Sequence, residues 1–303
     1  MNTKEYKETL FAEIKKQYGN LPSDDWKRYY KGKCSEMLSF MEEQNKKAGI
    51  FENSSNKGEH QHFWEVLVGN TLLGEEYNPK RDNRDGAPDY FFEQNGIKFH
   101  IEAKAPTEGI VEELKPKKIP MLDVETINDE NSFQSGIMEG KNCILRFTSI
   151  LDTAIKQINT KFYRLGRVVK DDKVIVAING SNVVKNTEIH RDNFNAGCLS
   201  YGFNIFCALY GLDGNEFYLP DENIYVLNEA YVKKNGVAIP NRFFCSDNDT
   251  PIDGVIYSNV DIKNYFSYDL PFLFFPNPNK EDISNYFPFC KIIKPQVRYV
   301  KQK

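Results

Sequence analysis

The sequence lacks several features that mark whole classes of protein. Its six cysteines are scattered with no Cys-x-x-Cys pair, so neither a zinc module nor a disulfide framework is indicated, and we expect reduced thiols. No stretch reaches the roughly 18 consecutive apolar residues of a membrane helix, and residues 1–5 are too polar to open a secretory signal. A Walker loop, a dinucleotide glycine motif and internal repeats are also missing. We therefore expect a cytoplasmic protein with no membrane partner.

Positive charge is also scarce. The 303 residues carry 39 Lys and Arg against 43 Asp and Glu, a formal net charge of −4. This balance argues against a protein that coats nucleic acid through bulk electrostatics, because phosphate neutralisation dominates such binding. With 40% hydrophobic and 14% aromatic residues, the chain can still bury a substantial core without disulfides.

The most informative segment is a predicted hairpin. Asn95-Gly96 is flanked by strand-forming residues, which predicts a two-residue type I′ turn. The register fixed by that turn places Asp89 directly opposite Glu102. Residues opposite each other have Cβ atoms about 4.5 to 5.5 Å apart on the same face of a sheet. Strand alternation adds Lys104 to that face.

Two carboxylates in this arrangement predict a metal site. Like charges directly opposite each other destabilise a sheet unless a cation lies between them. Ligands that are all oxygen favour a hard ion, so Asp89 and Glu102 predict bound Mg²⁺, with Mn²⁺ as a substitute. The carbonyl of Ala103 could join them. The alternative is a surface hairpin with ordinary solvated charges. The predicted register and the strand alternation favour the metal site over this alternative.

These residue types suit phosphodiester hydrolysis. That reaction needs a positioned water and positive charge on the phosphoryl oxygens, which a metal ion and an ammonium group supply together. Lys104 stands beside two carboxylates, so we expect it to stay charged and to act as electrostatic stabiliser and water-positioner rather than as a neutral base.

The segment also resembles a known signature. A Pro-Asp pair ends at Asp89, and a Glu-Ala-Lys triplet that ends at Lys104 follows one hairpin later. These residues and their spacing resemble the signature of the PD-(D/E)xK nuclease superfamily. Element order extends a looser resemblance over residues 58–180. The resemblance implies a restriction-endonuclease-like fold, Asp89 and Glu102 as Mg²⁺ ligands and Lys104 as the catalytic lysine. It further implies a ligand on the preceding helix, for which Glu65 is the candidate.

The hydrophobic pattern predicts the surrounding elements. Helical spacing occurs in residues 3–18, 24–48, 59–73 and 144–165, and the apolar residues 173–178 predict a strand covered on both faces. Short strands are also predicted at 217–219, 224–226, 253–257 and 272–275. We expect an α/β fold whose restriction-endonuclease-like core has a central mixed β-sheet flanked by helices.

This pattern gives a domain plan. We expect an N-terminal helical segment, residues 1–57, and a nuclease domain, residues 58–303. Within the latter, residues 58–180 would form the catalytic core, and residues 181–303 the C-terminal elaborations with recognition elements. Aromatic side chains in 181–303 could stack bases, although a role in the core is the commoner explanation.

Basic loops flank the predicted site. Lys80, Arg81 and Arg84 lie in the loop that enters the Asp89 strand, so we expect them to contact phosphates. A second cluster, in the loop after Lys104, contains Lys115, Lys117 and Lys118. Ordinary solvated loop charge is an equal alternative for any single one of these side chains.

Other polar residues give weaker signals. His100 shares the predicted catalytic face, although packing against Phe91 explains it equally well. His60 and His62 fall on different faces of a helix, which favours capping or surface roles. Gln157 would open the Gln-x-x-x-Tyr element of the RecB-like nuclease branch, but position 161 is lysine, so that branch is disfavoured.

The sequence therefore predicts a Mg²⁺-dependent endonuclease that hydrolyses DNA phosphodiester bonds, as a restriction or defence enzyme by analogy. Cutting both strands of a duplex usually needs two active sites, so a homodimer is expected. The alternatives are an RNA-cleaving nuclease of the same fold and a non-catalytic module that binds nucleic acid or protein. Asp89, Glu102 and Lys104 favour catalysis, since a binding module has no reason to aim two carboxylates at phosphates.

Overall fold

The computed structural model describes part of the chain. The described residues are 1–50, 58–82, 84–106, 144–183, 203–210, 230–232, 238–240, 243–244, 250–262, 265–266 and 272–294. The chain divides into two compact units, of which the first comprises Met1–Ala105, Asn159–Ser181 and Ser258–Phe272. The predicted hairpin belongs to this first unit. The basic cluster after Lys104 and the predicted strands at 217–219 and 224–226 lie outside the described residues.

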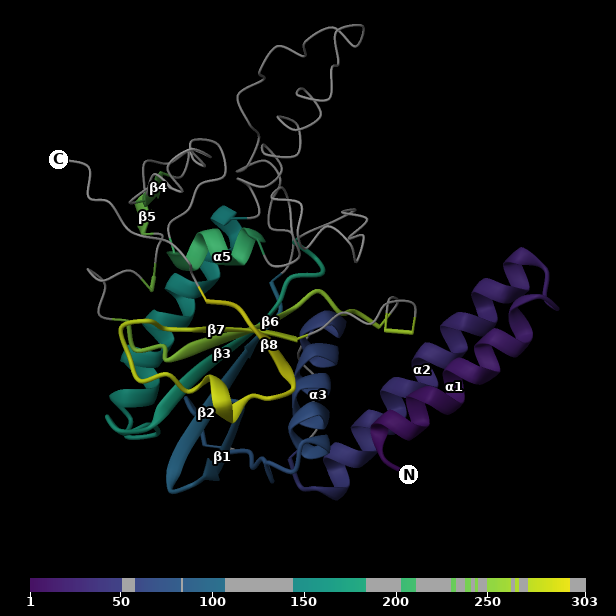
Figure 1. Ribbon diagram of the computed structural model, residues 1–303, viewed down its shortest axis with the longest axis horizontal. Helices are drawn as coiled ribbons and strands as arrows, with labels where there is room; N and C mark the ends of the chain where they lie inside the picture. The colour runs from purple at the N-terminus through teal and green to yellow at the C-terminus, as the bar shows by residue number, and fades with distance from the viewer. Residues whose placement is uncertain are drawn as a thin grey trace, which may run out of the picture. The chain divides into compact units, whose positions relative to one another are not determined.

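The central feature is a six-stranded mixed sheet of order β1-β2-β3-β6-β7-β8 (Figure 1). β1 pairs antiparallel with β2, β2 parallel with β3, and β6 antiparallel with β7. The expected α/β architecture with a mixed sheet is therefore confirmed, whereas the restriction-endonuclease-like core stays a prediction. The strands are β1 (Tyr90–Gln94), β2 (Ile97–Lys104), β3 (Lys173–Asn179), β6 (Gly254–Ser258), β7 (Phe272–Pro276) and β8 (Cys290–Ile292), and β4 (Ala230–Val232) pairs separately with β5 (Ala238–Pro240).

The β1–β2 hairpin has the predicted turn and register. Asn95 and Gly96 have φ values of 54° and 76°, the left-handed pair that a type I′ turn requires. Gln94 pairs with Ile97, and the pairing continues without a bulge to Tyr90 and Ile101. Asp89 precedes the first paired residue, so the predicted pairing of Asp89 with Glu102 lies just beyond the observed register.

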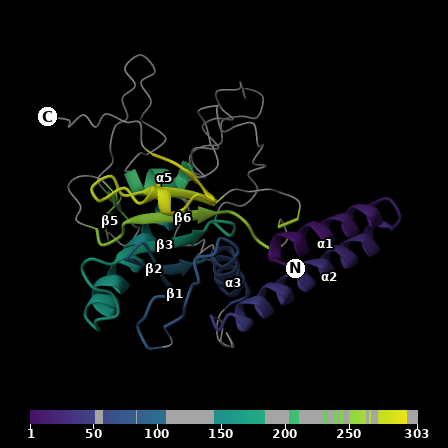
Figure 2. The ribbon, with the colours of Figure 1, turned by 60° about the horizontal axis from the view of Figure 1, so that its bottom comes forward.

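Three helices of the first unit pack on one another and on the hairpin. α1 (Thr3–Tyr18) begins with a capping box in which Asn2 and Glu5 exchange hydrogen bonds. α2 (Ser23–Lys47) is joined to α3 (Glu59–Gly74) by a buried network in which Asn70 Nδ2 donates to Met41 O and Asn45 Oδ1. Residues 1–50 thus form two helices that lie side by side (Figure 2) and contact α3, whereas a separate segment 1–57 stays a prediction.

The long helix predicted near 144–165 changes form before its end. Residues 144–157 are α-helical, Ile158–Tyr163 form a π-helix, and a turn with Gly166 at φ 64° follows. β3 then contributes five consecutive residues, 174–178, that are fully buried, as expected for a strand covered on both faces. The remaining helices are α5 (Phe203–Tyr210) and the short 3-10 turn η5 (Ser284–Tyr286). Within the described residues, no helix combines the length and apolarity needed to cross a membrane.

Candidate functional site

The Asp89 carboxylate is fixed to the opposite strand. Asp89 lies just before β1, where the strand has not yet begun its regular pairing. Its Oδ2 accepts a hydrogen bond of 2.9 Å from the backbone N of Ala103. The carboxylate is therefore held at the end of β2 by a main-chain donor, which orients it independently of any flexible side chain.

Glu102 and Lys104 form an ion pair beside this bond. Lys104 Nζ lies 2.5 Å from Glu102 Oε1, and the Glu102 side chain is only 6% exposed while that of Lys104 is 25% exposed. The two residues are separated by one position, so the strand projects both from the same face. A carboxylate this buried needs a nearby positive charge to remain ionised, and the ammonium group supplies one.

Gln61 on α3 connects the helix to the same strand end. Its Nε2 donates to Glu65 Oε1 (2.7 Å) and to the carbonyl of Ala103 (2.9 Å), while its Oε1 accepts from the N of Ala105 (2.7 Å). Sequence reasoning did not identify Gln61. The available signal was its spacing from Glu65, since residues four apart share a helix face.

Two further bonds lock the helical turn that carries Glu65. The Tyr90 hydroxyl donates to the carbonyl of Glu65 (2.7 Å), and Trp64 Nε1 donates to the carbonyl of Ala177 (2.9 Å). Glu65 itself is 1% exposed. α3 is thereby attached to β1, β2 and β3, and Glu65 comes to the strand end as the resemblance implied.

The predicted site residues thus meet around one backbone unit, Ala103. Asp89 binds its N–H, Gln61 binds its carbonyl and holds Glu65, and Glu102 and Lys104 flank it in the strand. Within the described residues, no group of three or more His, Cys, Asp or Glu side chains is arranged to hold one metal ion. The arrangement offers carboxylate and carbonyl oxygens, the donor type that Mg²⁺ and Mn²⁺ prefer, and Mg²⁺ commonly uses only one or two carboxylates.

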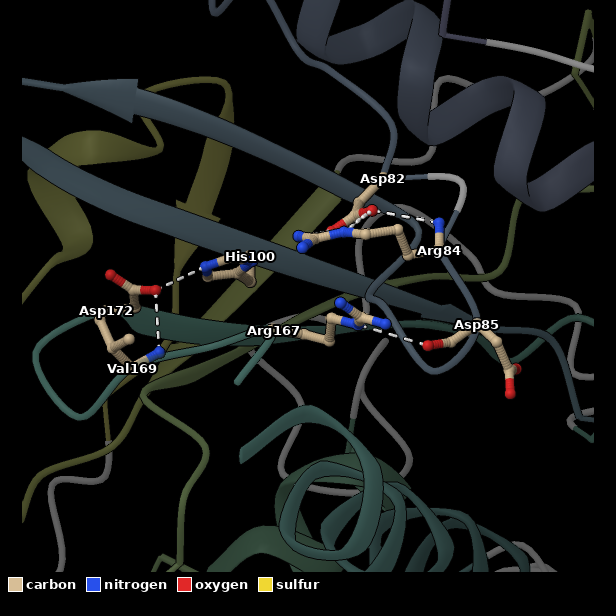
Figure 3. Close-up of polar contacts among 7 residues, drawn as sticks. All are labelled: Asp82, Arg84, Asp85, His100, Arg167, Val169 and Asp172. Atoms are coloured by element: carbon tan, nitrogen blue, oxygen red, sulfur yellow. Dashed lines mark hydrogen bonds and ion pairs between the residues drawn. The ribbon is translucent and has the colours of Figure 1, made fainter. Parts of the chain in front are cut away.

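His100 lies on the same strand face and bonds away from Ala103. Its Nε2 lies 2.8 Å from Asp172 Oδ2, in the turn before β3, and its ring packs against Phe91 at 6.2 Å between centroids. Figure 3 shows this bond together with a second one to the same carboxylate from Val169 N. Burial lowers the pKa of His100, and the Asp172 carboxylate partly opposes that shift. The ring contact confirms the predicted packing of His100 against Phe91.

The three predicted phosphate-binding residues differ in their surroundings. Arg84 forms a two-pronged pair with Asp82, and its side chain remains 61% exposed. Lys80 is exposed, and its backbone pairs with Phe91. Arg81 is half-buried. Asp82 raises the pKa of the Arg84 guanidinium by direct hydrogen bonding, so this group stays charged.

His60 and His62 on α3 have partners in neighbouring segments. His62 Nε2 lies 2.6 Å from Glu42 Oε1 of α2, and His60 Nε2 lies 3.4 Å from Ser181 Oγ. Burial lowers the pKa of His60. Both residues therefore connect α3 to neighbouring segments of the first unit.

Comparison of the chain with models of protein families, with characterised proteins and with solved structures gives no match.

Proposed function

We propose that this protein is a metal-dependent nuclease whose active centre is the end of β2 around Ala103. The observation that supports it is the end of the hairpin, where the Asp89 carboxylate bonds the N–H of Ala103, which lies between Glu102 and Lys104 in the strand. An acidic pair and a lysine on one rigid hairpin have the chemistry that phosphodiester hydrolysis requires.

The proposed metal ligands are Asp89, Glu102 and the carbonyl of Ala103, with Glu65 as a further ligand from α3. Bound Mg²⁺ or Mn²⁺ would supply positive charge against a phosphoryl oxygen. The hydrogen bond from Ala103 N fixes the Asp89 carboxylate, and Gln61 fixes that of Glu65. Preorganised ligands of this kind do not have to reorient when the ion binds.

Lys104 would act directly on the substrate. Its ammonium group lies beside Glu102 and is one-quarter exposed, so it can reach solvent while remaining oriented by the carboxylate. In this position it would orient the attacking water by hydrogen bonding and neutralise charge that develops on the phosphoryl oxygens. Its contact with the Glu102 carboxylate favours this electrostatic role over that of a general base.

DNA is the proposed substrate, with Lys80, Arg81 and Arg84 as phosphate contacts and a homodimer for cutting both strands of a duplex. A restriction or defence role follows by analogy with nucleases of the resembled family. RNA cleavage by the same residues is the second candidate. A binding module without catalysis is the third.

A cleavage assay separates these candidates. Plasmid DNA and a structured RNA are incubated with the protein in Mg²⁺, in Mn²⁺ and in EDTA, beside the Asp89→Ala and Lys104→Ala variants. The proposal expects metal-dependent DNA cleavage that both variants lose. Cleavage of RNA alone would move the substrate to the second candidate, and no cleavage of either polymer with either metal would refute the enzymatic function.

A further inference from the structure

Two loops far apart in the sequence lie against each other beside β2. One comprises residues 80–82 and 84–86, the other residues 161–170, and we call them together the basic loop pair. Gly86 is the point of approach: it has φ +70°, and a Cβ there would lie 2.9 Å from Leu165 Cδ1 and 3.4 Å from Lys161 Cβ. Arg167 Nε adds a long hydrogen bond of 3.4 Å to the carbonyl of Asp85 (Figure 3). A glycine thus allows the two loops to meet.

The basic loop pair concentrates positive charge in a chain that is acidic overall. It contains two acidic residues, Asp82 and Asp85, against the basic residues Lys80, Arg81, Arg84, Lys161, Arg164, Arg167 and Lys170. Two more aspartates, Asp171 and Asp172, follow directly, and the second of these is bound to His100. The surface therefore remains positive where the whole chain has a formal charge of −4.

Most of the basic side chains in the basic loop pair are exposed to solvent. Lys161, Arg164 and Lys170 are exposed and form no ion pair within the part of the chain that the structure describes. Hydrogen bonding from Arg84 is the main cause that lowers the pKa of Asp82, and the charge of Arg167 on the second loop adds a smaller contribution. Guanidinium groups from both loops thus act on one carboxylate.

The basic loop pair lies along the strand face that carries the proposed active centre. Asp172, directly after the second loop, bonds His100, which is two residues before Glu102 on the same face of β2. Strands rise about 3.3 Å per residue, so His100, where this region begins, lies about 7 Å from Glu102 along β2. At about 3.4 Å per nucleotide along one strand of a duplex, that distance corresponds to about two nucleotides.

We propose that residues 161–170 form the second half of a DNA-backbone contact surface, which binds phosphates about two nucleotides from the bond that is cut. Lys161, Arg164, Arg167 and Lys170 contact phosphates, and the exposed side chains of Leu165 (43%) and Val169 (59%) face the sugars between them. This inference rests on the proposed function in taking DNA as the partner. It assigns binding to a segment for which no phosphate contact was predicted from the sequence.

The test measures DNA binding separately from cleavage. Every protein carries Lys104→Ala, so the probe is not cut, and binding of a fluorescent 20-base-pair duplex is followed by anisotropy in EDTA at several salt concentrations. The test variant adds Lys161→Ala, Arg164→Ala and Lys170→Ala. Its matched control adds Lys16→Ala, Lys31→Ala and Lys46→Ala, three exposed lysines of α1 and α2. Circular dichroism melts verify that both sets fold.

The test variant is expected to bind at least tenfold more weakly near 0.1 M salt. Its plot of log K against log [salt] should be shallower by about 2 to 3, because each lost phosphate contact removes about 0.9 from the slope. The control should match its Lys104→Ala parent. Equal binding by all three proteins, no DNA binding by the parent, or an equal loss in the control would each overturn the inference.

The same experiment distinguishes this inference from the proposed function. If the loop variant loses binding while the protein with Lys104 intact cuts no nucleic acid, the contact surface stands and the nuclease falls. If the protein cuts DNA and the loop variant binds normally, the nuclease stands and the surface falls. If the Lys104→Ala parent binds RNA and does not bind DNA, the proposal that DNA is the partner is overturned.

Discussion

The two ends of β2 carry charged groups under opposite conditions. At its C-terminal end, Asp89 and Gln61 each form a 2.9 Å hydrogen bond with the backbone of Ala103, Lys104 Nζ lies 2.5 Å from Glu102 Oε1, and Glu102 is almost completely buried. Toward its N-terminal end, the basic loop pair presents exposed side chains held by Asp82 and by one long bond to Asp85. Chemistry requires groups held in fixed positions, whereas phosphate contacts require charge with little geometric precision.

Removal of charge at the buried end should have the largest effect. In Asp89→Asn, the side-chain oxygen can still accept the bond from Ala103 N while the negative charge is lost. We expect cleavage to fall by at least about 100-fold to 1000-fold, with the free energy of unfolding changed by less than about 1 kcal/mol. Cleavage kinetics and urea denaturation measure the two quantities. Wild-type cleavage by this variant would remove Asp89 from the active centre, and a large loss of stability would make its role structural.

The Gln61 side chain clamps α3 to the end of β2 through its hydrogen bonds, and its removal should mainly lower the stability of the protein. Gln61→Leu preserves approximate size but leaves Ala105 N and the carbonyl of Ala103 without their side-chain partner. Because these groups are partly buried, we expect the free energy of unfolding to fall by about 1 to 3 kcal/mol. A matched variant at the half-buried Gln44 of α2, Gln44→Leu, should change it by less than about 0.5 kcal/mol, because this side chain has no hydrogen bond within the described residues. Equal losses in the two variants, measured by urea denaturation, would show that the clamp does not stabilise the strand end.

These two predictions also separate what the sequence could and could not predict. The Asn95-Gly96 turn fixes a register by local backbone geometry, so Asp89 and Glu102 could be placed opposite each other without any knowledge of the rest of the chain. The apolar residues that form β3 could also be recognised as a strand from the local sequence alone. Gln61 was missed because a glutamine on a helix is ordinary, and only the packing of α3 on β2 makes it a clamp.

The contacts of the exposed end depend on pairing over long sequence separations. His100 meets Asp172 because β2 and β3 are parallel neighbours, and no local pattern states that pairing. The change from α-helix to π-helix at Ile158 and the approach of Gly86 to Leu165 are likewise tertiary. Hydrophobic periodicity predicted the helix, but the position of its last turns depends on what packs there.

Adding a methyl group at Gly86, where the two loops meet, should test whether the basic loop pair acts as one surface. In Gly86→Ala, the new Cβ meets Leu165 and the residue keeps a left-handed φ, so we expect a loss of about 1 to 2 kcal/mol of unfolding free energy and weaker DNA binding. Leu165→Ala in the same chain removes the steric part and leaves the backbone part. Partial recovery of the melting temperature in the double variant is the expected result, and none would show that strain in φ alone is responsible.

The smallest effect is expected from an exposed ion pair in the second unit, which contrasts with the buried pair of Lys104 and Glu102. Lys294 and Ser284 lower the pKa of Asp282 from 3.8 to about 2. A carboxyl whose folded pKa is depressed contributes stability above its unfolded pKa and loses it as pH falls through the folded value. The contribution should therefore disappear between about pH 4 and pH 2, and solvent screening keeps it below about 1 kcal/mol, because both side chains are more than half exposed. Lys294→Met should reduce the acid sensitivity of the melting temperature across this window, since it removes the principal cause of the shift. An unchanged acid profile in that variant would show that the exposed pair contributes nothing measurable, which would confine useful ion pairing to the buried end of β2.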